Sequence, residues 1–483
     1  MATVTERLER AIEREAPAWG IRPTPPEVRR LSGLDFAVLW GDLGIGLLVL
    51  VTGSLLVPAL GLPQAVLAIV VGSVIGCVPL ALVGRAGARE GVPGMVLLRP
   101  ALGIRGSYVP TVLNVAQLVG WTAFELWAMA LIASRIAGGG FLVWLVVVAA
   151  ICLVLSLGGP IVVVRRWMAR FGVWVVIAVA GYLTIRLFLT ADLGALWSMP
   201  GTGGYPSFWP AVDLVIAMPI SWIPLVADYN RFARRGTSSG VGTYVGYLLA
   251  NVWFYSLGAL LVLAGSAGEP SVGGIADGIV AVAGGTVLLV ALLVGETDEA
   301  FADIYSASVS AQNLDPRLSQ RAGVAVVTAL GVAGAAWLST LPDQGVLTYE
   351  LFLLLIGSIF VPLFGVFLAD YHVLHRGRGY RTDALFDPRG PYRYSGGVHL
   401  AAAGAWLLGF LAYHWTAPTA IPGWSEAMET VFAGWLGLPF PLFGGAVPAS
   451  VLSFAVGFSA YLGLAWAGRR LSLSARPGAA TRS

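Results

Sequence analysis

Apolar runs long enough to cross a lipid bilayer recur along almost the whole chain. A spanning helix needs about 20 mainly apolar residues. We identify twelve such runs, at 35–60, 63–84, 106–134, 140–160, 167–189, 208–230, 241–265, 279–310, 322–341, 348–374, 398–417 and 447–468. A hydrophobic content of 57%, a charged content of 11% and a mean hydropathy of +0.80 exclude an ordinary soluble protein. The sequence therefore predicts an all-α polytopic membrane protein with twelve transmembrane helices.

The basic residues predict the orientation of these spans. All 29 are arginine, and 27 of them fall on one side of the membrane when the N-terminus is placed inside. Only Arg135 and Arg186 fall on or near the other side. Since positive residues collect in cytoplasmic loops, we expect a multi-pass protein of a bacterial-type inner membrane with cytoplasmic N- and C-termini.

The order of spans and loops predicts the division of the chain. Five is an odd number, so spans 1–5 and 6–10 would enter the membrane from opposite sides as an inverted repeat. Residues 1–34 combine Glu and Arg with a proline-rich stretch, which is not a signal peptide. The predicted parts are a cytoplasmic arm (1–34), a first five-helix repeat (35–190), a second repeat (206–375), a basic cytoplasmic loop (376–397), helices 11 and 12 (398–468) and a cytoplasmic tail (469–483).

The eighth predicted span carries carboxylates that lipid does not readily accept. The four acidic residues are Glu296, Asp298, Glu299 and Asp303. A charged side chain at the bilayer centre costs roughly 3 kcal/mol on insertion scales. Glu299, Asp303 and the two serines that follow at helical spacing share one face. We interpret this face as the lining of a transport site; the alternative is a solvated, structural helix end at the interface.

Glycine, proline and polar residues interrupt the first and sixth spans at corresponding places. Span 1 contains WGDLGIG at 40–46, and span 6 contains Pro219, Ser221, Trp222 and Pro224. Broken helices expose carbonyl groups and helix ends that can hold a cation and a polar substrate. Both spans are expected to be broken at the site; the alternative is that these residues merely kink or pack the helices.

The third span carries a matching polar stripe. Its members, spaced by three, four and four, are Asn114, Gln117, Trp121 and Glu125. An indole can stack on a planar ring, while an amide and a carboxylate can bind the polar edge of a nitrogen-rich heterocycle. The alternative is polar contact between helices.

At these positions the chain resembles the nucleobase–cation symporter family, which includes cytosine permeases and carriers of hydantoins and hydroxymethylpyrimidine. The resemblance covers most of 30–415, and its specific segments are NVAQLVGWTAFELW, SWIPLVADYNRF and DIYSASVSAQN. It implies a LeuT-like fold with a five-plus-five inverted repeat and broken helices 1 and 6. It also implies a substrate held between Trp121 and Trp222, and a cation held between the first and eighth spans.

The site residues that we expect from residues and resemblance together form two sets. The substrate-binding set is Trp121, Gln117, Glu125, Trp222, Ser221, Asp303 and Gly46. The set that binds or couples the cation is Asp42, Ile45, Thr297, Asp298 and Glu299. Relatives tend to carry Gln at the position of Glu125 and Asn at that of Asp303. The extra carboxylates favour an amino-bearing or cationic substrate, or coupling to protons.

The leading hypothesis is a secondary active transporter, and not an enzyme, that imports a nucleobase or related pyrimidine by cation symport with alternating access. Cytosine or hydroxymethylpyrimidine is favoured; a purine, allantoin or hydantoin symporter of the same fold is the alternative. The coupling ion is Na⁺ or H⁺, with no cofactor, no other metal and no nucleic acid partner. Asp228 and Arg231 are a possible gate or a local ion pair. The oligomeric state stays open.

Hypotheses from other classes make different predictions. A membrane-embedded enzyme could use the carboxylates for acid–base chemistry, but no nucleophile–base pair, metal-ligand set or cofactor motif accompanies them. A channel or a non-transporting sensor is the third hypothesis. Accumulation of solute against a gradient distinguishes a carrier from a channel.

Overall fold

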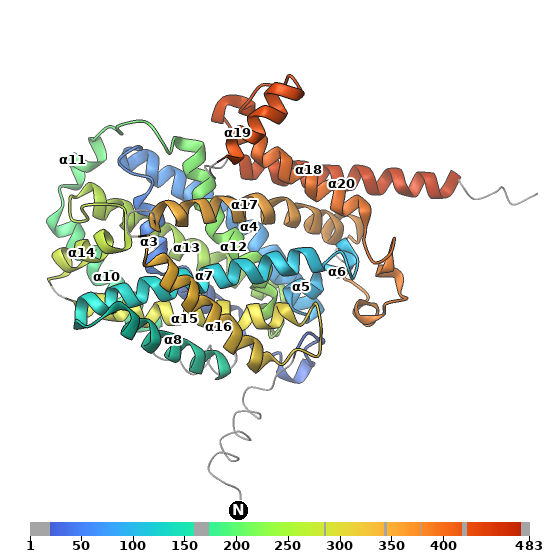
Figure 1. The fold of residues 1–483 in the computed structure, drawn as a ribbon, viewed down its shortest axis with the longest axis horizontal. Helices are drawn as coiled ribbons and strands as arrows, with labels where there is room; N and C mark the ends of the chain where they lie inside the picture. Colours follow the sequence, from blue (N-terminus) through green and yellow to red (C-terminus); the bar gives the residue numbers. More distant parts are fainter. Residues whose placement is uncertain are drawn as a thin grey trace, which may run out of the picture. The chain divides into compact units, whose positions relative to one another are not determined.

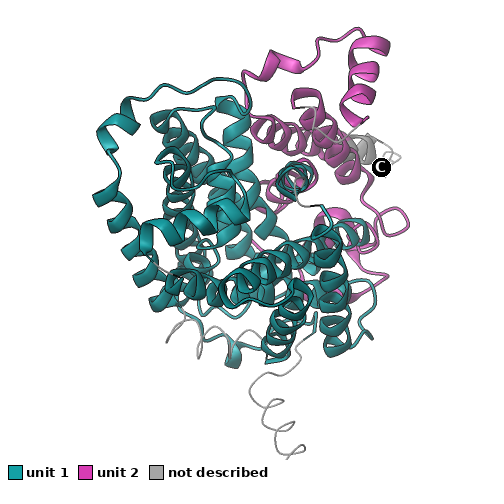
Figure 2. Ribbon diagram, turned by 60° about the vertical axis from the view of Figure 1, so that its left-hand side comes forward, with its two compact units in different colours: residues 1–97, 108–357 teal, residues 98–107, 358–483 magenta. Residues whose placement is uncertain are grey.

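The computed structural model of the protein describes residues 20–158, 173–284, 286–341, 345–376, 378–417 and 423–474. This part of the chain is built mainly from long helices (Figure 1). It divides into two compact units, shown in different colours in Figure 2. The first unit holds 1–97 and 108–357, and the second holds 98–107 and 358–483. All residues of the expected site belong to the first unit.

The helices of the first unit correspond to the predicted spans and their connections. In chain order they are α2 (Gly33–Asp42), α3 (Leu47–Ser54), α4 (Leu62–Glu90), α5 (Gly94–Leu97), α7 (Tyr108–Ala137), α8 (Phe141–Gly158), α10 (Val173–Thr190), α11 (Leu193–Ser198), α12 (Phe208–Asn230), α13 (Gly236–Leu263), α14 (Val272–Ala283), α15 (Val287–Ala311), α16 (Gln320–Leu338) and α17 (Gly345–Leu368), which continues into the second unit.

The first span is broken, as predicted. Helix α2 begins in a capping box, because the Ser32 N–H donates to the Asp35 carboxylate and the Asp35 N–H donates to the Ser32 hydroxyl. It ends at Asp42, and α3 begins at Leu47 after an extended Gly46. The two helices meet at an angle of 61°. Residues 43–46 therefore separate two half-helices.

The sixth span differs from the prediction, because α12 is one continuous helix from Phe208 to Asn230. Pro219 and Pro224 lie inside it and each removes one backbone donor. The helix is buried on nearly all sides, so neighbouring helices support it around these prolines. The predicted break in span 6 is therefore wrong: the prolines only remove backbone hydrogen bonds within a continuous helix.

Helix α13 packs against both halves of the broken span. Its glycines allow the backbones to approach closely: Gly242 and Gly246 lie against α2 at Gly33 and Ala37, and Gly258 lies against α3 at Leu50. A Cβ added at any of the three would meet a carbonyl group of the facing half-helix. One uninterrupted helix therefore spans the break.

The carboxylate-bearing helix α15 packs against α7, α8 and α16. Its four acidic side chains are almost completely buried, with exposed fractions of 0–4%. This excludes the interfacial alternative for these groups, since a solvated helix end would leave the carboxylates exposed. The α15 face points into the helix bundle.

Nine helices of the described chain are long and apolar enough to cross a membrane, or ten if α2 and α3 form one span. Helix α15, with its carboxylates, and the 17-residue α18 (Leu400–Thr416) are not among them. Each predicted span has a helix at its position, but the count of twelve stays a prediction.

The second unit is organised around a helical hairpin-like pair. Its elements are α6 (Arg99–Leu102), the end of α17, η3 (Ala369–Leu374), η4 (Thr382–Phe386), η5 (Pro391–Arg393), α18, α19 (Trp424–Glu429), η6 (Thr430–Trp435), η7 (Leu442–Gly445) and α20 (Ala449–Ser474). Helices α18 and α20 pack together, and η3 packs against α20. Asp370 of η3 is buried and accepts hydrogen bonds from the hydroxyls of Tyr380 and Tyr461, each at 2.6 Å.

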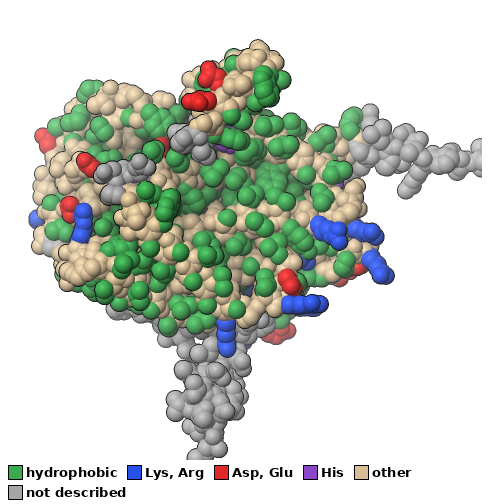
Figure 3. Space-filling view, viewed as in Figure 1, with side chains coloured by type: hydrophobic (Ala, Val, Ile, Leu, Met, Phe, Trp, Pro, Cys, Tyr) green, Lys and Arg blue, Asp and Glu red, His purple; other side chains and the backbone are tan. Residues whose placement is uncertain are grey.

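Apolar side chains cover much of the surface in Figure 3, and charged ones are few. Many large apolar residues are exposed, among them Leu142, Val146 and Val154 of α8 and Ile185 and Leu189 of α10. A soluble protein rarely exposes such continuous apolar area, whereas lipid covers it at no cost. Helices α8 and α10 are therefore among the helices of the first unit that we expect to face lipid.

Candidate functional site

Six carboxylates from three elements gather in the first unit, and we refer to them together as the carboxylate site. They are Asp42, Glu125, Glu296, Asp298, Glu299 and Asp303. Each is at most 4% exposed. Asp42 comes from the end of α2, Glu125 from α7 and the other four from α15. Sequence reasoning placed these helices together, and the structure brings their side chains into one buried group.

Glu296 caps the second half-helix. Its carboxylate accepts hydrogen bonds from the backbone N–H groups of Leu47 and Leu48, the first residues of α3. These groups have no partner inside the helix, and the helix dipole favours a negative charge at this end. We did not place Glu296 among the expected site residues. Its spacing of three from Glu299 was the available signal.

Glu299 lies against the break itself. A Cβ added to Gly46 would fall on the Glu299 carboxylate, so glycine leaves the room that this side chain occupies. Glu299 Oε1 is buried and has no hydrogen-bond partner among the described protein groups. The carboxyl groups of Asp42 and Asp298 share a hydrogen bond beside it. The break and α15 thus meet through carboxylates, at the place where we expect a cation.

Glu125 and Asp303 form a second pair, between α7 and α15. Their carboxyl groups share a hydrogen bond. Two bare carboxylates do not approach so closely unless a proton or a cation lies between them. Glu125 Oε2 is buried and has no described partner. The pair therefore offers a buried, electron-rich surface to a positively polarised group.

The polar stripe of α7 connects three helices. The Gln117 amide donates to Asn114 Oδ1 at 2.8 Å and to the carbonyl of Ser221 in α12 at 3.0 Å. Asn114 Nδ2 donates to the Ser310 hydroxyl of α15 at 2.9 Å. Part of the stripe is thus the helix-to-helix contact that we named as the alternative. Gln117 Oε1 remains buried without a described partner.

The two expected tryptophans belong to different aromatic groups. Trp121 packs edge-on against Tyr349 and Phe352 of α17, at ring-centroid distances of 5.9 and 5.2 Å. Trp222 packs edge-on against Trp40 of α2 at 5.9 Å. Trp121 Nε1 is buried with no described partner, which leaves one donor available. The sandwich of a ring between Trp121 and Trp222 stays a prediction.

Tyr349 is a further residue that sequence reasoning missed. Its hydroxyl lies 2.8 Å from Thr52 Oγ1 and 3.1 Å from the carbonyl of Leu48, both in α3. Tyr349 therefore contacts α3 through its hydroxyl and Trp121 through its ring. It lies between Thr348 and Glu350 in the sequence, and no spacing rule relates it to α3 or to Trp121.

Three expected residues contribute less directly. The Thr297 hydroxyl donates to the Val294 carbonyl of its own helix at 2.7 Å, and its side chain is only half-buried. The Ser221 hydroxyl donates to the Met218 carbonyl at 2.7 Å. Ile45 is buried, and its N–H donates to the Asp42 carbonyl at 2.9 Å. These bonds stay within one helix or one turn.

The expected gate residues have partners on other segments. Asp228 accepts from the Gly94 N–H at the start of α5, at 2.8 Å. Arg231 donates to the Gly20 carbonyl at 2.7 Å and to the Tyr305 hydroxyl at 3.1 Å. Both side chains are fully buried. They tie α12 to the segment before α2, to α5 and to α15; a gating role stays a prediction.

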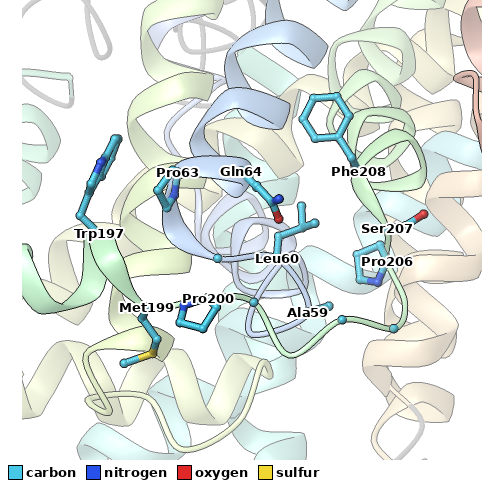
Figure 4. A pocket seen from close by; sticks show the side chains of 14 residues that line it. Ala59, Leu60, Pro63, Gln64, Trp197, Met199, Pro200, Pro206, Ser207 and Phe208 are labelled. Carbon is cyan, nitrogen blue, oxygen red and sulfur yellow. The ribbon is translucent and has the colours of Figure 1, made fainter.

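Figure 4 shows a pocket of about 650 Å³ elsewhere in the first unit, beside the starts of α4 and α12. Leu60, Gln64, Trp197, Met199 and Phe208 are among its lining residues, and none of the lining side chains is charged. It shares no residue with the carboxylate site. The carboxylate site, and not this pocket, is where we expect the substrate.

Known proteins resemble this chain over most of its length. YxlA of Bacillus subtilis (strain 168), a purine-cytosine permease by its name, is 27% identical over 382 residues, covering 76% of this chain and 81% of that protein. The hydantoin permease of Microbacterium maritypicum is 25% identical over 459 residues, covering 88% and 90%.

A solved structure shares the fold. Mhp1, a nucleobase-cation-symport-1 family transporter in a closed conformation with bromovinylhydantoin bound, superposes with a TM-score of 0.76 at 21% identity, covering 94% of this chain and 96% of that one. The family model for permeases of cytosine and purines, uracil, thiamine and allantoin matches residues 23–436. The resemblance inferred from the sequence is confirmed: the chain belongs to this family of membrane permeases, the nucleobase–cation symporters.

Proposed function

We propose that this permease imports an amino-bearing pyrimidine, with cytosine or hydroxymethylpyrimidine favoured. Transport would occur by cation symport with alternating access across a bacterial-type inner membrane, with both termini in the cytoplasm. The observation that carries the proposal is the Glu125–Asp303 pair, whose carboxyl groups share a buried hydrogen bond. Trp121 lies one helical turn before Glu125 on the same face of α7.

The Glu125–Asp303 pair fits the edge of a heterocycle on which an amino group stands next to a ring nitrogen. Its oxygens can accept from the amino hydrogens, and the proton of the pair can be given to the ring nitrogen. A heterocycle edge that presents only carbonyl oxygens would fit less well, because those oxygens and the carboxylate oxygens are all hydrogen-bond acceptors. In the proposed site Trp121 and Trp222 stack on the ring, while Gln117, Ser221 and Gly46 complete the lining.

The cation would bind at the break of the first span. The Asp42 and Ile45 backbone, Asp298 and Glu299 supply hard oxygen ligands of the kind that sodium prefers, and Thr297 stands one residue away. The same carboxylates can take up a proton. Both Na⁺ and H⁺ therefore stay as candidates for the coupling ion.

A purine, allantoin or hydantoin symporter of the same fold is the second candidate. The observation that favours it is the similarity to a hydantoin permease over 88% of this chain. Hydantoin and allantoin present carbonyl and N–H groups alternately, so they would need the Glu125–Asp303 pair to act mainly as acceptor.

A thermal-shift panel on the purified protein tests the proposal. It would compare cytosine, hydroxymethylpyrimidine, a purine, allantoin and hydantoin, each with and without sodium at two pH values. A ligand that binds only the folded state stabilises it by mass action. We expect the amino-bearing pyrimidines to stabilise most, with an effect that depends on sodium or on pH. Stabilisation by hydantoin alone would favour the second candidate.

A further inference from the structure

The start of α3 is an anion-binding position that the protein fills itself. The N–H groups of Leu47 and Leu48 lie at the first turn of this half-helix, beside the break, and donate to the carboxylate site at Glu296. Unpaired N–H groups and the helix dipole make such an end attractive to an external carboxylate or phosphate. Here both donors are taken by Glu296.

Glu296 occupies both N–H donors at the start of α3 and lies against Gly46. Its side chain is fully buried, and its Oε1 lies about 3.0 Å from where a Cβ on Gly46 would be. Glu299 follows three residues later, and its carboxylate lies against the same side of Gly46. Glu296 Oε2 is buried without a described hydrogen-bond partner, so the negative charge of this carboxylate is only partly balanced by the α3 donors.

We propose that Glu296 is a specificity-determining residue that excludes anionic heterocycles by occupying the N-terminus of α3 with a carboxylate of the protein itself. The inference rests on the proposed function, because it assumes that the substrate binds beside this break. It defines the substrate class further: the transported ring is neutral or positively charged and bears no carboxylate.

A matched pair of ligands tests the inference on the unaltered protein. Cytosine and 5-carboxycytosine differ by one carboxylate, and we expect only cytosine to stabilise the protein. The variant Glu296→Ala vacates the helix end. We expect its unfolding equilibrium constant to rise by about 2- to 30-fold, the range of a lost N-terminal cap. We also expect it to bind cytosine more weakly and to gain stabilisation by 5-carboxycytosine.

Chemical rescue separates this role from a merely structural one. Acetate supplies the carboxylate that the variant lacks, so we expect it to raise the thermal stability of Glu296→Ala and restore its cytosine affinity. The control is Glu299→Ala, which removes the neighbouring carboxylate but leaves the α3 cap in place; acetate should not restore it. Stabilisation of the unaltered protein by 5-carboxycytosine, or rescue of both variants alike, would overturn the inference.

The outcomes remain distinguishable from failure of the proposed function. Acetate stabilisation of Glu296→Ala needs no heterocycle, so it is expected even if neither pyrimidine binds. Should Glu296→Ala fail to fold, Glu296→Gln keeps an oxygen acceptor for the Leu47 N–H. We then expect that variant to fold and to show no stabilisation by acetate, and stabilisation of Glu296→Gln by acetate would contradict the inference.

Discussion

Buried carboxylates occur in both units of this protein, with different partners. In the second unit, Asp370 accepts from two tyrosine hydroxyls at 2.6 Å, and His375 Nδ1 lies 3.3 Å from it. In the carboxylate site of the first unit, Glu125, Glu299 and Asp303 interact mainly with other carboxylates. Burial of an acid is therefore not in itself a sign of function.

The difference lies in charge and hydrogen-bond balance. Neutral donors satisfy Asp370 within the protein, so its role is complete without a ligand. The carboxylate site brings negative groups together and leaves Glu125 Oε2 and Glu299 Oε1 without protein donors. Such an arrangement is stable only when protons or cations balance it, which is the requirement of a cation-coupled transporter.

The largest effect is expected for Asp303→Asn, which breaks the Glu125–Asp303 pair. Loss of one partner of a buried, hydrogen-bonded charge pair typically costs about 2–5 kcal/mol, or about 30- to 5,000-fold in affinity. Cytosine binding, measured by calorimetry on the purified protein, should fall by this factor. A variant that binds cytosine as tightly as the unaltered protein would contradict the proposed role of the pair.

Trp121→Ala should have the next largest effect. Stacking of a base on an aromatic side chain is worth about 1–3 kcal/mol, so affinity should fall by about 5- to 150-fold and uptake should be lost. Trp337→Ala is the matched control, because Trp337 lies on α16 and is 57% exposed. Equal loss in both variants would point to a general effect on folding.

Asp370→Asn should show that Asp370 contributes to stability, whereas the carboxylate site contributes to ligand binding. The amide can accept from only one of the two tyrosines through its oxygen, so one hydroxyl loses its acceptor. We expect a stability loss of about 1–3 kcal/mol, visible in the unfolding temperature. Cytosine affinity of the folded fraction should be unchanged. A specific loss of cation dependence would show that Asp370 also serves transport.

The smallest effect is expected for Thr297→Ala. Because its hydroxyl already donates to Val294 and its side chain is half-buried, sodium affinity should change by about twofold or less, below 0.5 kcal/mol. The measurement is sodium-dependent cytosine binding across a sodium titration. A decrease of tenfold or more would instead assign the hydroxyl oxygen to the cation.

Helical spacing and membrane physics were enough to predict the main parts of this arrangement. The four carboxylates of α15 could be assigned to a buried face because lipid does not tolerate them. The break at 43–46 could be predicted from its glycines and from Asp42 directly before it. Both predictions use residues close in sequence, where periodicity carries the information.

The remaining features depend on contacts between distant segments. Glu296 and Leu47 are separated by 249 positions, and no spacing rule relates them. Tyr349 reaches Thr52 across 297 positions. The prolines of span 6 suggested a break, but burial among neighbouring helices keeps α12 continuous. Tertiary packing decided each of these features.

The glycine face of α13 has a mechanical consequence. Helix α13 contacts α2 before the 61° break and α3 after it, and these contacts hold the two half-helices at a fixed angle. The two half-helices can change their mutual angle only if α13 bends or its glycine contacts open. We therefore expect the two half-helices to move as one rigid body during transport, so that the ligand groups at the break keep their relative positions.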